Sequence, residues 1–265
     1  MSSARVHPTA IVDPTVRLAE DVVVGPYAVL EGAIELGPRC AVKPHVHMIG
    51  PLVMGPENTI CSGAVIGERP QHLKFDGAPT GIVIGAGNVF REHITVHSGT
   101  TDAGTRIGDK NYFMAGAHVA HDCTVGDRCI FANGALLGGH CEAHDAAFLS
   151  GNCAVHQFCR CGRLSMMSGG ATTSKDVPPF FVQEGRNRLV GVNVVGMRRA
   201  GLKSVQIDAI REAYRILYLQ RMVLPAACEH IKRHLGHVDV VAELLEFIRS
   251  SKRGITSTSG YTEAA

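Results

Sequence analysis

A six-residue repeat of apolar residues constrains this chain more than any other feature of its sequence. Between residues 6 and 66 every sixth residue is apolar, as at Val6, Val24, Val42 and Ile60. A six-residue period with an apolar first position is typical of a parallel β-helix. Three hexads complete one triangular coil, so that residues 18 apart lie above one another. The repeat predicts a mainly β chain that forms a left-handed parallel β-helix, the hand being that of the hexapeptide class rather than the usual right-handed crossover.

The repeat is interrupted twice, and each interruption predicts a loop. It stops at Glu68 and resumes at Ile84, and it stops again after Val96 and resumes at Ile107. Breaks in a solenoid usually form loops on one face, and that face is often the binding face. We therefore expect extruded loops near residues 68–82 and 98–106.

The last third of the chain has a different pattern. The hexads end near Thr173, and Pro178 and Pro179 follow, neither of which can donate to a strand ladder. We expect a β-helix domain over residues 1–185 and a connection with a C-terminal α-helical domain over 186–265. Ser204 is a candidate cap of the first helix, two more helices are expected near 225–235 and 238–252, and a frayed tail follows from 254.

Composition excludes several classes of protein. A net charge of +2 does not suggest bulk binding of nucleic acid. No apolar run is long enough for a membrane span, and the first residues do not resemble a secretory signal. Six of the nine cysteines occupy the fifth hexad position, where a buried thiol acts as a small hydrophobic group. A reduced, cytoplasmic protein is the expectation.

The strongest catalytic candidates follow from the 18-residue stacking. His121 is followed by Asp122, and a carboxylate beside an imidazole can fix its tautomer and support it as a general base. Gly139 and His140 lie one coil further on, about 4.8 Å away. A backbone N–H at Gly139 could hold the oxyanion of an acyl-transfer intermediate. The plain alternative is a surface turn with an ordinary histidine and ordinary turn glycines.

Other residues could bind a polar substrate. His118, His140 and His156 could donate hydrogen bonds, although each could equally be a histidine of the wall. Lys74 in the first loop and the Arg198–Arg199 pair could meet phosphates or an acidic partner protein. His118 and His121 also have a spacing compatible with zinc.

Several motifs of the chain appear in the order known from one enzyme family. They are VHPTAIV near the start, IGE followed by QHLKF, FREHITVHSGT, AHVAHDCTVG, AVHQF, KDVPPF and GVN followed by RR. Together they span about residues 5–250. In this ordered set the chain resembles the bacterial UDP-N-acetylglucosamine acyltransferases that begin lipid A synthesis.

The resemblance implies a cytoplasmic homotrimer that uses no cofactor and no metal. Such an enzyme moves an (R)-3-hydroxyacyl chain from acyl carrier protein, whose thioester is a co-substrate, to the 3-position of UDP-N-acetylglucosamine. His121 would be the general base, Asp122 its support and Gly139 the oxyanion donor. The residues implied to position the substrate are His72, Lys74, His118, His140, His156, Gln157, Asn193, Arg198 and Arg199.

The chain also departs from the family pattern. His72 stands where the family usually has Asp, and a UDP-sugar with a 3-amino group becomes an alternative acceptor. Val195 and Ala200 replace a Glu and an Arg that meet the nucleotide. Gly169 aligns with the position that sets acyl length, and a glycine there suggests a longer chain.

Two rival functions come from other classes. One is a zinc hydratase of the γ-carbonic-anhydrase type, which uses the same β-helix and histidines. The other is a non-catalytic scaffold subunit. The QHLKF loop and the helical C-terminal region argue against the hydratase.

Overall fold

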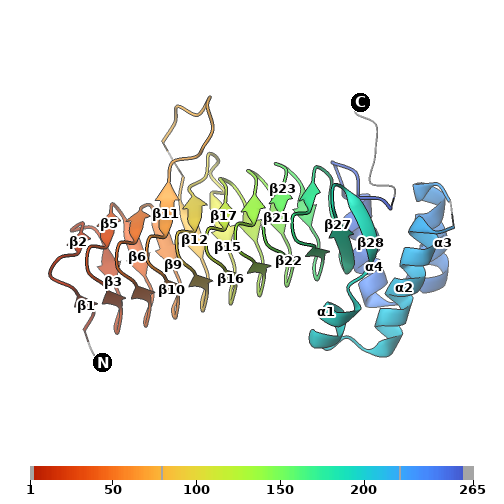
Figure 1. Ribbon diagram of the computed structural model, residues 1–265, viewed down its shortest axis with the longest axis horizontal. Coiled ribbons are helices and arrows are strands. Elements are labelled where there is room, and N and C mark those ends of the chain that lie inside the picture. Colours follow the sequence, from red (N-terminus) through yellow and green to blue (C-terminus); the bar gives the residue numbers. More distant parts are fainter. Residues whose placement is uncertain (1–2, 79, 221, 259–265) are drawn as a thin grey trace.

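The chain forms a long triangular prism of short strands with a small helical region at its C-terminal end (Figure 1). The computed structural model describes residues 3–78, 80–220 and 222–258. Each full coil contributes one strand to each of three sheets, which are parallel except for a last hairpin.

The bounds of the strands are as follows. Sheet 1 contains β1 (Arg5–Val6), β4 (Val23–Val24), β7 (Ala41–Val42), β10 (Thr59–Ile60), β13 (Val89–Phe90), β16 (Tyr112–Phe113), β19 (Ile130–Phe131), β22 (Phe148–Leu149), β25 (Met166–Met167), β27 (Phe181–Glu184) and β28 (Arg188–Val192). Sheet 2 contains β2 (Ile11–Val12), β5 (Val29–Glu31), β8 (His47–Ile49), β11 (Val65–Glu68), β14 (Thr95–His97), β17 (His118–Val119), β20 (Leu136–Leu137), β23 (Ala154–Val155) and β26 (Thr172–Thr173). Sheet 3 contains β3 (Arg17–Leu18), β6 (Ile34–Leu36), β9 (Leu52–Met54), β12 (Ile82–Ile84), β15 (Thr105–Ile107), β18 (Thr124–Val125), β21 (Glu142–Ala143) and β24 (Arg160–Cys161).

The hexad explains which side chains form the core. Successive residues of a strand point to opposite faces, so the first residue of each hexad points inward. Leu30, Met48 and Phe131 are accordingly fully buried. Val6, in the first coil, is 44% exposed because no coil lies beneath it. The predicted fold class, a hexapeptide β-helix followed by a helical part, is confirmed.

The buried cysteines also behave as predicted. Those at the fifth hexad position are at most 1% exposed and all are free thiols. Several donate to a carbonyl of the next coil, as Cys123 Sγ does to Gly138 O at 3.0 Å and Cys141 Sγ to His156 O at 3.0 Å. The thiols therefore fill the corners of the core and satisfy backbone acceptors there.

Both extruded loops leave the prism from one edge. Regular coils pair residues 18 apart, but Ile66 pairs with Val96, so that this coil holds 12 extra residues. Val96 pairs with Val119, 23 residues on, so that the next coil holds five extra. Each insertion follows a strand of sheet 2 and precedes a strand of sheet 3. We call this corner of the prism the insertion edge; its longer loop stands out beyond β11 in Figure 1.

The helical region contains α1 (Val194–Arg199), α2 (Ser204–Tyr218), α3 (Leu224–Leu235) and α4 (Asp239–Arg249). The predicted cap was wrong by one residue, because Lys203 precedes α2 and Ser204 is already helical. The last helix ends at Arg249 rather than near 252. The expected connection over 186–200 contains β28 and α1, which are too short to show a period in the sequence.

The tail was predicted to fray from residue 254, and this is wrong for the part that the structure describes. Ile255 and Ser257 form bridges to Asp176 and Arg188. Backbone pairing needs no apolar side chain, so a polar sequence did not reveal it. Residues 259–265 of the predicted tail lie outside the described residues. The division of the chain at residue 185 stays a prediction.

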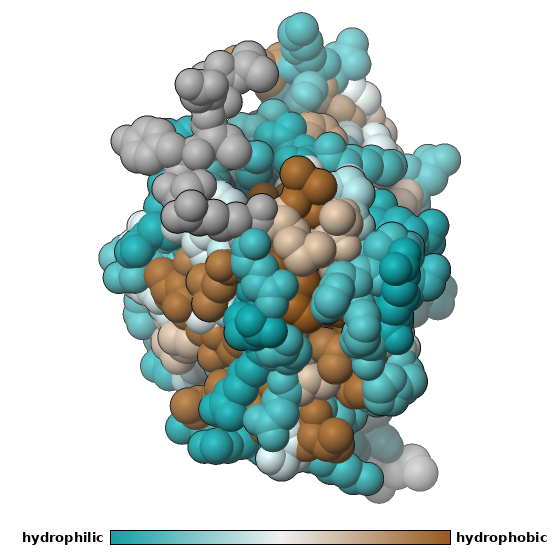
Figure 2. Space-filling view, turned by 90° about the vertical axis from the view of Figure 1, so that its right-hand side faces the viewer, coloured by the Kyte–Doolittle hydropathy of each residue, from teal (hydrophilic) through white to brown (hydrophobic). Residues whose placement is uncertain are grey.

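The outer surface of the helical end mixes apolar and polar side chains (Figure 2). Val205, Leu219 and Val223 are exposed there. Within the described ranges, no helix has both the length and the apolar character that crossing a membrane requires.

Candidate active site

The candidate residues collect on the turns of the insertion edge. The register of β17, β20 and β23 places His121, Gly139 and Gln157 above one another on successive coils. His140 N–H donates to His121 O at 3.0 Å, and Phe158 N–H donates to Gly139 O at 3.0 Å. The 18-residue stacking inferred from sequence is therefore present at this edge.

His121 and Asp122 form a tight pair. His121 Nδ1 lies 2.7 Å from Asp122 Oδ2, and the two side chains are only 8% and 3% exposed. Asp122 has a left-handed backbone with φ of 58°, which turns its side chain back toward the imidazole. Its N–H donates to Thr105 Oγ1 at 2.9 Å.

The second inserted loop holds the Asp122 carboxylate. Thr100 and Thr101 each donate a backbone N–H and a hydroxyl to it at 2.7–3.0 Å. Burial alone would raise the pKa of Asp122, but the hydrogen bonds from His121, Thr100 and Thr101 outweigh it and hold that pKa well below its usual value. An ionised carboxylate fixes the proton of His121 on Nδ1, so Nε2 is left to accept a proton.

Gly139 is shaped to the imidazole of His121. A Cβ at residue 139 would lie only 2.7 Å from His121 Cε1 and Nε2. The ring thus occupies the space that any side chain would need. The Gly139 N–H donates to no group in the described part of the chain, whereas the N–H groups of Gly138 and His140 both have backbone partners. A free donor beside the base suits a developing negative charge.

Three further rings lie around His121 and its neighbour His140. His140 meets His121 edge to face at 5.0 Å and stacks on Phe158 at 4.7 Å. His72 reaches over from the first inserted loop and meets His121 edge to face at 5.7 Å. Burial lowers the pKa of His140, although the nearby Asp122 charge opposes that shift. His72, which departs from the family pattern, therefore faces the base directly.

His118 and His97 lie on the adjoining sheet 2. His118 Nδ1 is 2.7 Å from Thr95 Oγ1, and its ring meets His97 edge to face at 4.9 Å. Burial, with the nearby His97 and His121, lowers the pKa of His118 to about 4. His97 is 3% exposed and its Nδ1 has no hydrogen-bond partner. We expect both histidines to be neutral near pH 7.

Sequence reasoning missed His97, Thr100, Thr101 and Phe158. The two threonines lie in a stretch that breaks the repeat, which was a usable signal. Phe158 lies 18 residues after His140, so the constant period could have paired these two rings. His97 gave no signal, because the five-residue insertion between His97 and His118 hides their contact from a constant period.

Other predicted residues lie apart from His121 within one chain. His156 and Gln157 are exposed on the insertion edge, and Lys74 is exposed on the first loop. Asn193 instead caps α1: its Oδ1 accepts from Gly196 N at 2.9 Å, and its amide donates to Leu164 O at 2.8 Å.

Two more sets lie away from the insertion edge. Arg198 and Arg199 are exposed at the end of α1. Gly169 lies on the turn between β25 and β26, the edge between sheets 1 and 2. The predicted binding residues therefore do not all lie together within a single chain.

A metal could be considered only at one place among the residues described. His121, Asp122 and His140 offer ligand atoms within 4.8 Å of one another. The Asp122 oxygens, however, already accept hydrogen bonds from Thr100, Thr101 and His121. A metal would have to displace these donors, so the arrangement suits a supported base better than a zinc ligand set.

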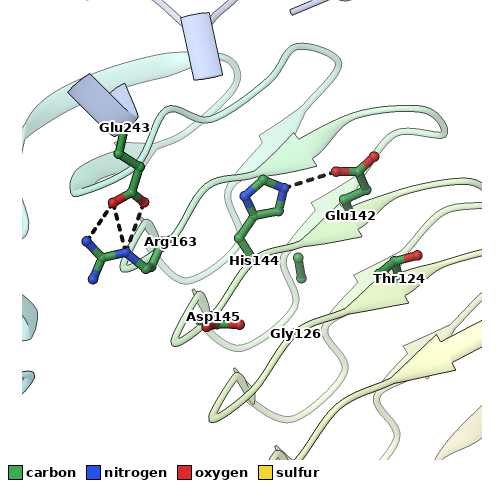
Figure 3. Close-up of a pocket in the computed structure, with 8 residues that line it drawn as sticks. Thr124, Gly126, Glu142, His144, Asp145, Arg163 and Glu243 are labelled. Carbon is green, nitrogen blue, oxygen red and sulfur yellow. Dashed lines mark hydrogen bonds and ion pairs between the residues drawn. The ribbon is translucent and has the colours of Figure 1, made fainter. Parts of the chain in front are cut away.

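A separate hollow of about 330 Å³ lies over sheet 3 beside α4 (Figure 3). Its polar side chains satisfy one another. Arg163 binds Glu243 at 2.7 Å, and His144 Nε2 lies 3.0 Å from Glu142 Oε2. The Arg163–Glu243 pair attaches α4 to the prism, whereas Glu142 and His144 both belong to the prism.

Family models match two parts of the chain. Residues 104–139 match the bacterial transferase hexapeptide repeat, and this match on the coils that carry His121 and Gly139 places the chain in the class of hexapeptide-repeat transferases. Residues 176–256 match domain 2 of UDP-N-acetylglucosamine O-acyltransferases.

Relatives along the full length define the family more narrowly. The acyl-[acyl-carrier-protein]–UDP-N-acetylglucosamine O-acyltransferase of Halorhodospira halophila is 48% identical over 95% of this chain and 98% of its own length. That of Thiobacillus denitrificans is 45% identical over 95% and 99%. The chain belongs to the family of UDP-N-acetylglucosamine O-acyltransferases, as its motifs predicted.

Solved structures agree. The UDP-N-acetylglucosamine acyltransferase of Bacteroides fragilis superimposes with a TM-score of 0.90 at 34% identity, covering 94% of this chain and 99% of that one. The structure of the Acinetobacter baumannii protein gives 0.89 at 36% identity, covering 95% and 99%.

Proposed function

We propose that this chain transfers an (R)-3-hydroxyacyl group from acyl carrier protein to the 3-hydroxyl of UDP-N-acetylglucosamine, the first step of lipid A biosynthesis. The observation that carries the proposal is the His121–Asp122 pair at 2.7 Å against a glycine whose N–H is free. The names of the full-length relatives support the same reaction.

The mechanism follows from the atoms of this pair. His121 Nε2 takes the proton of the sugar hydroxyl as that oxygen attacks the thioester carbonyl. The Gly139 N–H donates to the oxyanion of the tetrahedral intermediate. Collapse breaks the carbon–sulfur bond, and the His121 imidazolium returns its proton to the leaving thiolate. Asp122 stays ionised and stabilises the imidazolium in between. None of these steps requires a cofactor or a cysteine nucleophile.

The substrate would lie along the insertion edge. His72 and Lys74 approach from the loop, while His118, His140, His156 and Gln157 come from the coils. Asn193, Arg198 and Arg199 can act on the same substrate only if a second copy of the chain supplies them, because they lie on other parts of the prism.

This need for a second copy supports the homotrimer. The outward residues of sheet 1 give it a suitable surface, since Val89, Ile130, Phe148 and Met166 are apolar and at least partly exposed. We place the enzyme in the cytoplasm, where an acyl carrier protein donor would be found.

Gly169 remains our candidate for setting acyl length. It lies 48 residues after His121, or about 2.7 coils, which is roughly 13 Å along the axis at about 4.8 Å per coil. A Cβ there would meet only Gly151 O, at 3.8 Å. The glycine leaves the space beside this turn open, which suits a longer acyl chain when a second copy of the chain brings the turn to the substrate.

His72 bears on whether the acceptor atom of the sugar is oxygen or nitrogen, because its ring lies 5.7 Å from the ring of His121. The test is an acyl-transfer assay with 3-hydroxyacyl carrier proteins of several lengths. UDP-N-acetylglucosamine and its 3-amino analogue are offered side by side. We expect turnover of the hydroxyl sugar. Turnover of the amino sugar alone would move the function to N-acylation, and turnover of neither would overturn the proposal.

A further inference from the structure

A second pocket opens directly beside the base and has no assigned role. Its volume is about 240 Å³. One wall is formed by His140 and Phe158 of the insertion edge, and the opposite wall by Arg160, Lys252 and Arg253. His140 is also in ring contact with His121. A group bound in this pocket would therefore lie next to the reacting atoms.

The cationic wall is rigidly built. The Arg160 guanidinium binds the buried Asp176 at 2.9 Å, donates to Phe247 O at 3.0 Å and lies over the Phe247 ring at 4.2 Å. Ser251 Oγ donates to the same carboxylate at 2.8 Å. Arg160 is thus neutralised by Asp176 and serves to fix the segment that follows α4.

The two exposed cations of this wall are fixed by the backbone. Asp176 N–H donates to Gly254 O at 2.9 Å, and Thr256 N–H donates back to Asp176 O at 2.9 Å. Arg253 also donates to Ser174 O at 3.2 Å. Lys252 and Arg253 therefore lie in a bend directly before a paired segment, and the Arg253 side chain is itself held by Ser174.

The aromatic wall is also held in an uncommon conformation. Phe158 has φ of 65° and is still 51% exposed. A left-handed backbone costs a bulky residue about 1 kcal/mol or more. Stacking on His140 orients both rings at the mouth of the pocket.

The charges of the pocket favour an anion. Asp176 is balanced by Arg160, and Glu142, the other carboxylate of the lining, is attracted by Arg160 and Lys252, so that three cations of the lining face two carboxylates. Lys252 and Arg253 remain as the cations that a ligand would meet. Both substrates of the proposed reaction carry phosphate: the diphosphate of the nucleotide sugar and the phosphodiester of the carrier's pantetheine arm.

We propose that the pocket between His140–Phe158 and Lys252–Arg253 binds a substrate phosphate, with Lys252 as its principal charge contact. This inference rests on the proposed function for the identity of the ligand. It adds a binding role for the bend that follows α4, which neither the motifs nor the His121–Asp122 pair predicted.

The test compares Lys252→Gln with a matched control, Lys232→Gln, an exposed lysine on α3 outside this pocket. Binding of UDP-N-acetylglucosamine and of 4′-phosphopantetheine is measured by calorimetry on the full chain. We expect Lys252→Gln to bind one of the two about tenfold more weakly, equal to about 1.4 kcal/mol. Lys252→Arg should restore binding, and the control should bind like the parent protein.

The ligand that is lost identifies the source of the phosphate. Weaker binding of the nucleotide sugar assigns its diphosphate, and weaker binding of phosphopantetheine assigns the arm. Equal binding of both ligands by the parent and Lys252→Gln would overturn the inference. Turnover then separates the two proposals: a parent protein that binds phosphate at Lys252 but transfers no acyl group contradicts only the acyltransferase function.

Discussion

Two edges of the prism are built from the same turn and do different work. On the insertion edge, His121 occupies the third hexad position and Asp122 binds its ring. On the edge between sheets 3 and 1, Asp127 occupies that third position. Its Oδ1 accepts the N–H of Asp109 on the coil before at 2.8 Å. We call this corner the aspartate edge.

The aspartate edge repeats this contact from coil to coil. Ala86 N–H donates to Asp109, and Asp127 N–H donates to Asp145, at 2.7 and 3.0 Å. Its carboxylates therefore fasten one coil to the next. On the insertion edge the loop threonines satisfy Asp122 instead, and this leaves the carboxylate to orient an imidazole. The comparison shows that the insertions, rather than the turn, create the site.

The largest expected effect is at the base. His121→Ala removes proton abstraction, so kcat should fall by about 10²–10⁴-fold. Steady-state turnover measures this, and thermal unfolding should show a folded protein. Near-normal turnover would remove His121 from the mechanism.

The second largest effect on kcat is expected at the contact between Gly139 and His121, which lie on neighbouring coils of the insertion edge. Gly139→Ala places a Cβ 2.7 Å from the His121 ring and must displace it. A misplacement of about 1 Å can cost about 10²-fold, which we expect in kcat. Gly191→Ala is the control, since a Cβ there meets no atom within 4 Å and should leave kcat unchanged. Equal activity of the two variants would contradict the packing argument.

The insertion edge should also make stability depend on pH. His118 has a folded-state pKa of about 4 against 6.5 for the free side chain, so the unfolded chain binds its proton first. Its contribution is full above pH 6.5 and is lost as pH falls from 6.5 to 4, by about 3 kcal/mol. Urea unfolding at several pH values measures this.

His118→Gln should reduce that loss, whereas His230→Gln, an exposed histidine of α3, should not. An unchanged pH dependence in His118→Gln would show that His118 is not the group responsible.

The smallest effect is expected on the aspartate edge. Asp127→Ala removes the acceptor of Asp109 N–H and should lower the free energy of unfolding by about 1 kcal/mol. Turnover should stay within about twofold, because no contact links Asp127 to His121 among the described residues. Denaturant unfolding measures the free energy of unfolding, and the acyl-transfer assay measures turnover. A large loss of turnover with stability unchanged would reverse the roles of the edges.

Much of the site could be predicted from the sequence because the repeat has a constant period. A constant 18-residue coil brings His121 and Gly139 together without any knowledge of tertiary contacts. The period predicts no contacts where an insertion interrupts it. His72, Thr100 and Thr101 reach the base through insertions whose conformation no period describes, and His97 had no constellation around it in the sequence.

The helical region shows the same limit. The long helices have an apolar stripe and were predicted to within a few residues. The short α1, the hairpin of β27 and β28, and the bridge at Ile255 depend on backbone pairing with distant segments, which leaves little pattern in the residues themselves.

The sequence by itself determined the coil, the buried corners and the stacking of His121 on Gly139, because a six-residue period sets which residues point inward and which lie 18 apart. Only the tertiary structure decided what surrounds the base. Two threonines from an inserted loop hold Asp122 ionised, a histidine from the other loop faces His121, and the segment after α4 brings Lys252 into a pocket with His140. Those contacts join segments between 20 and about 130 residues apart, and folding alone brings such segments together.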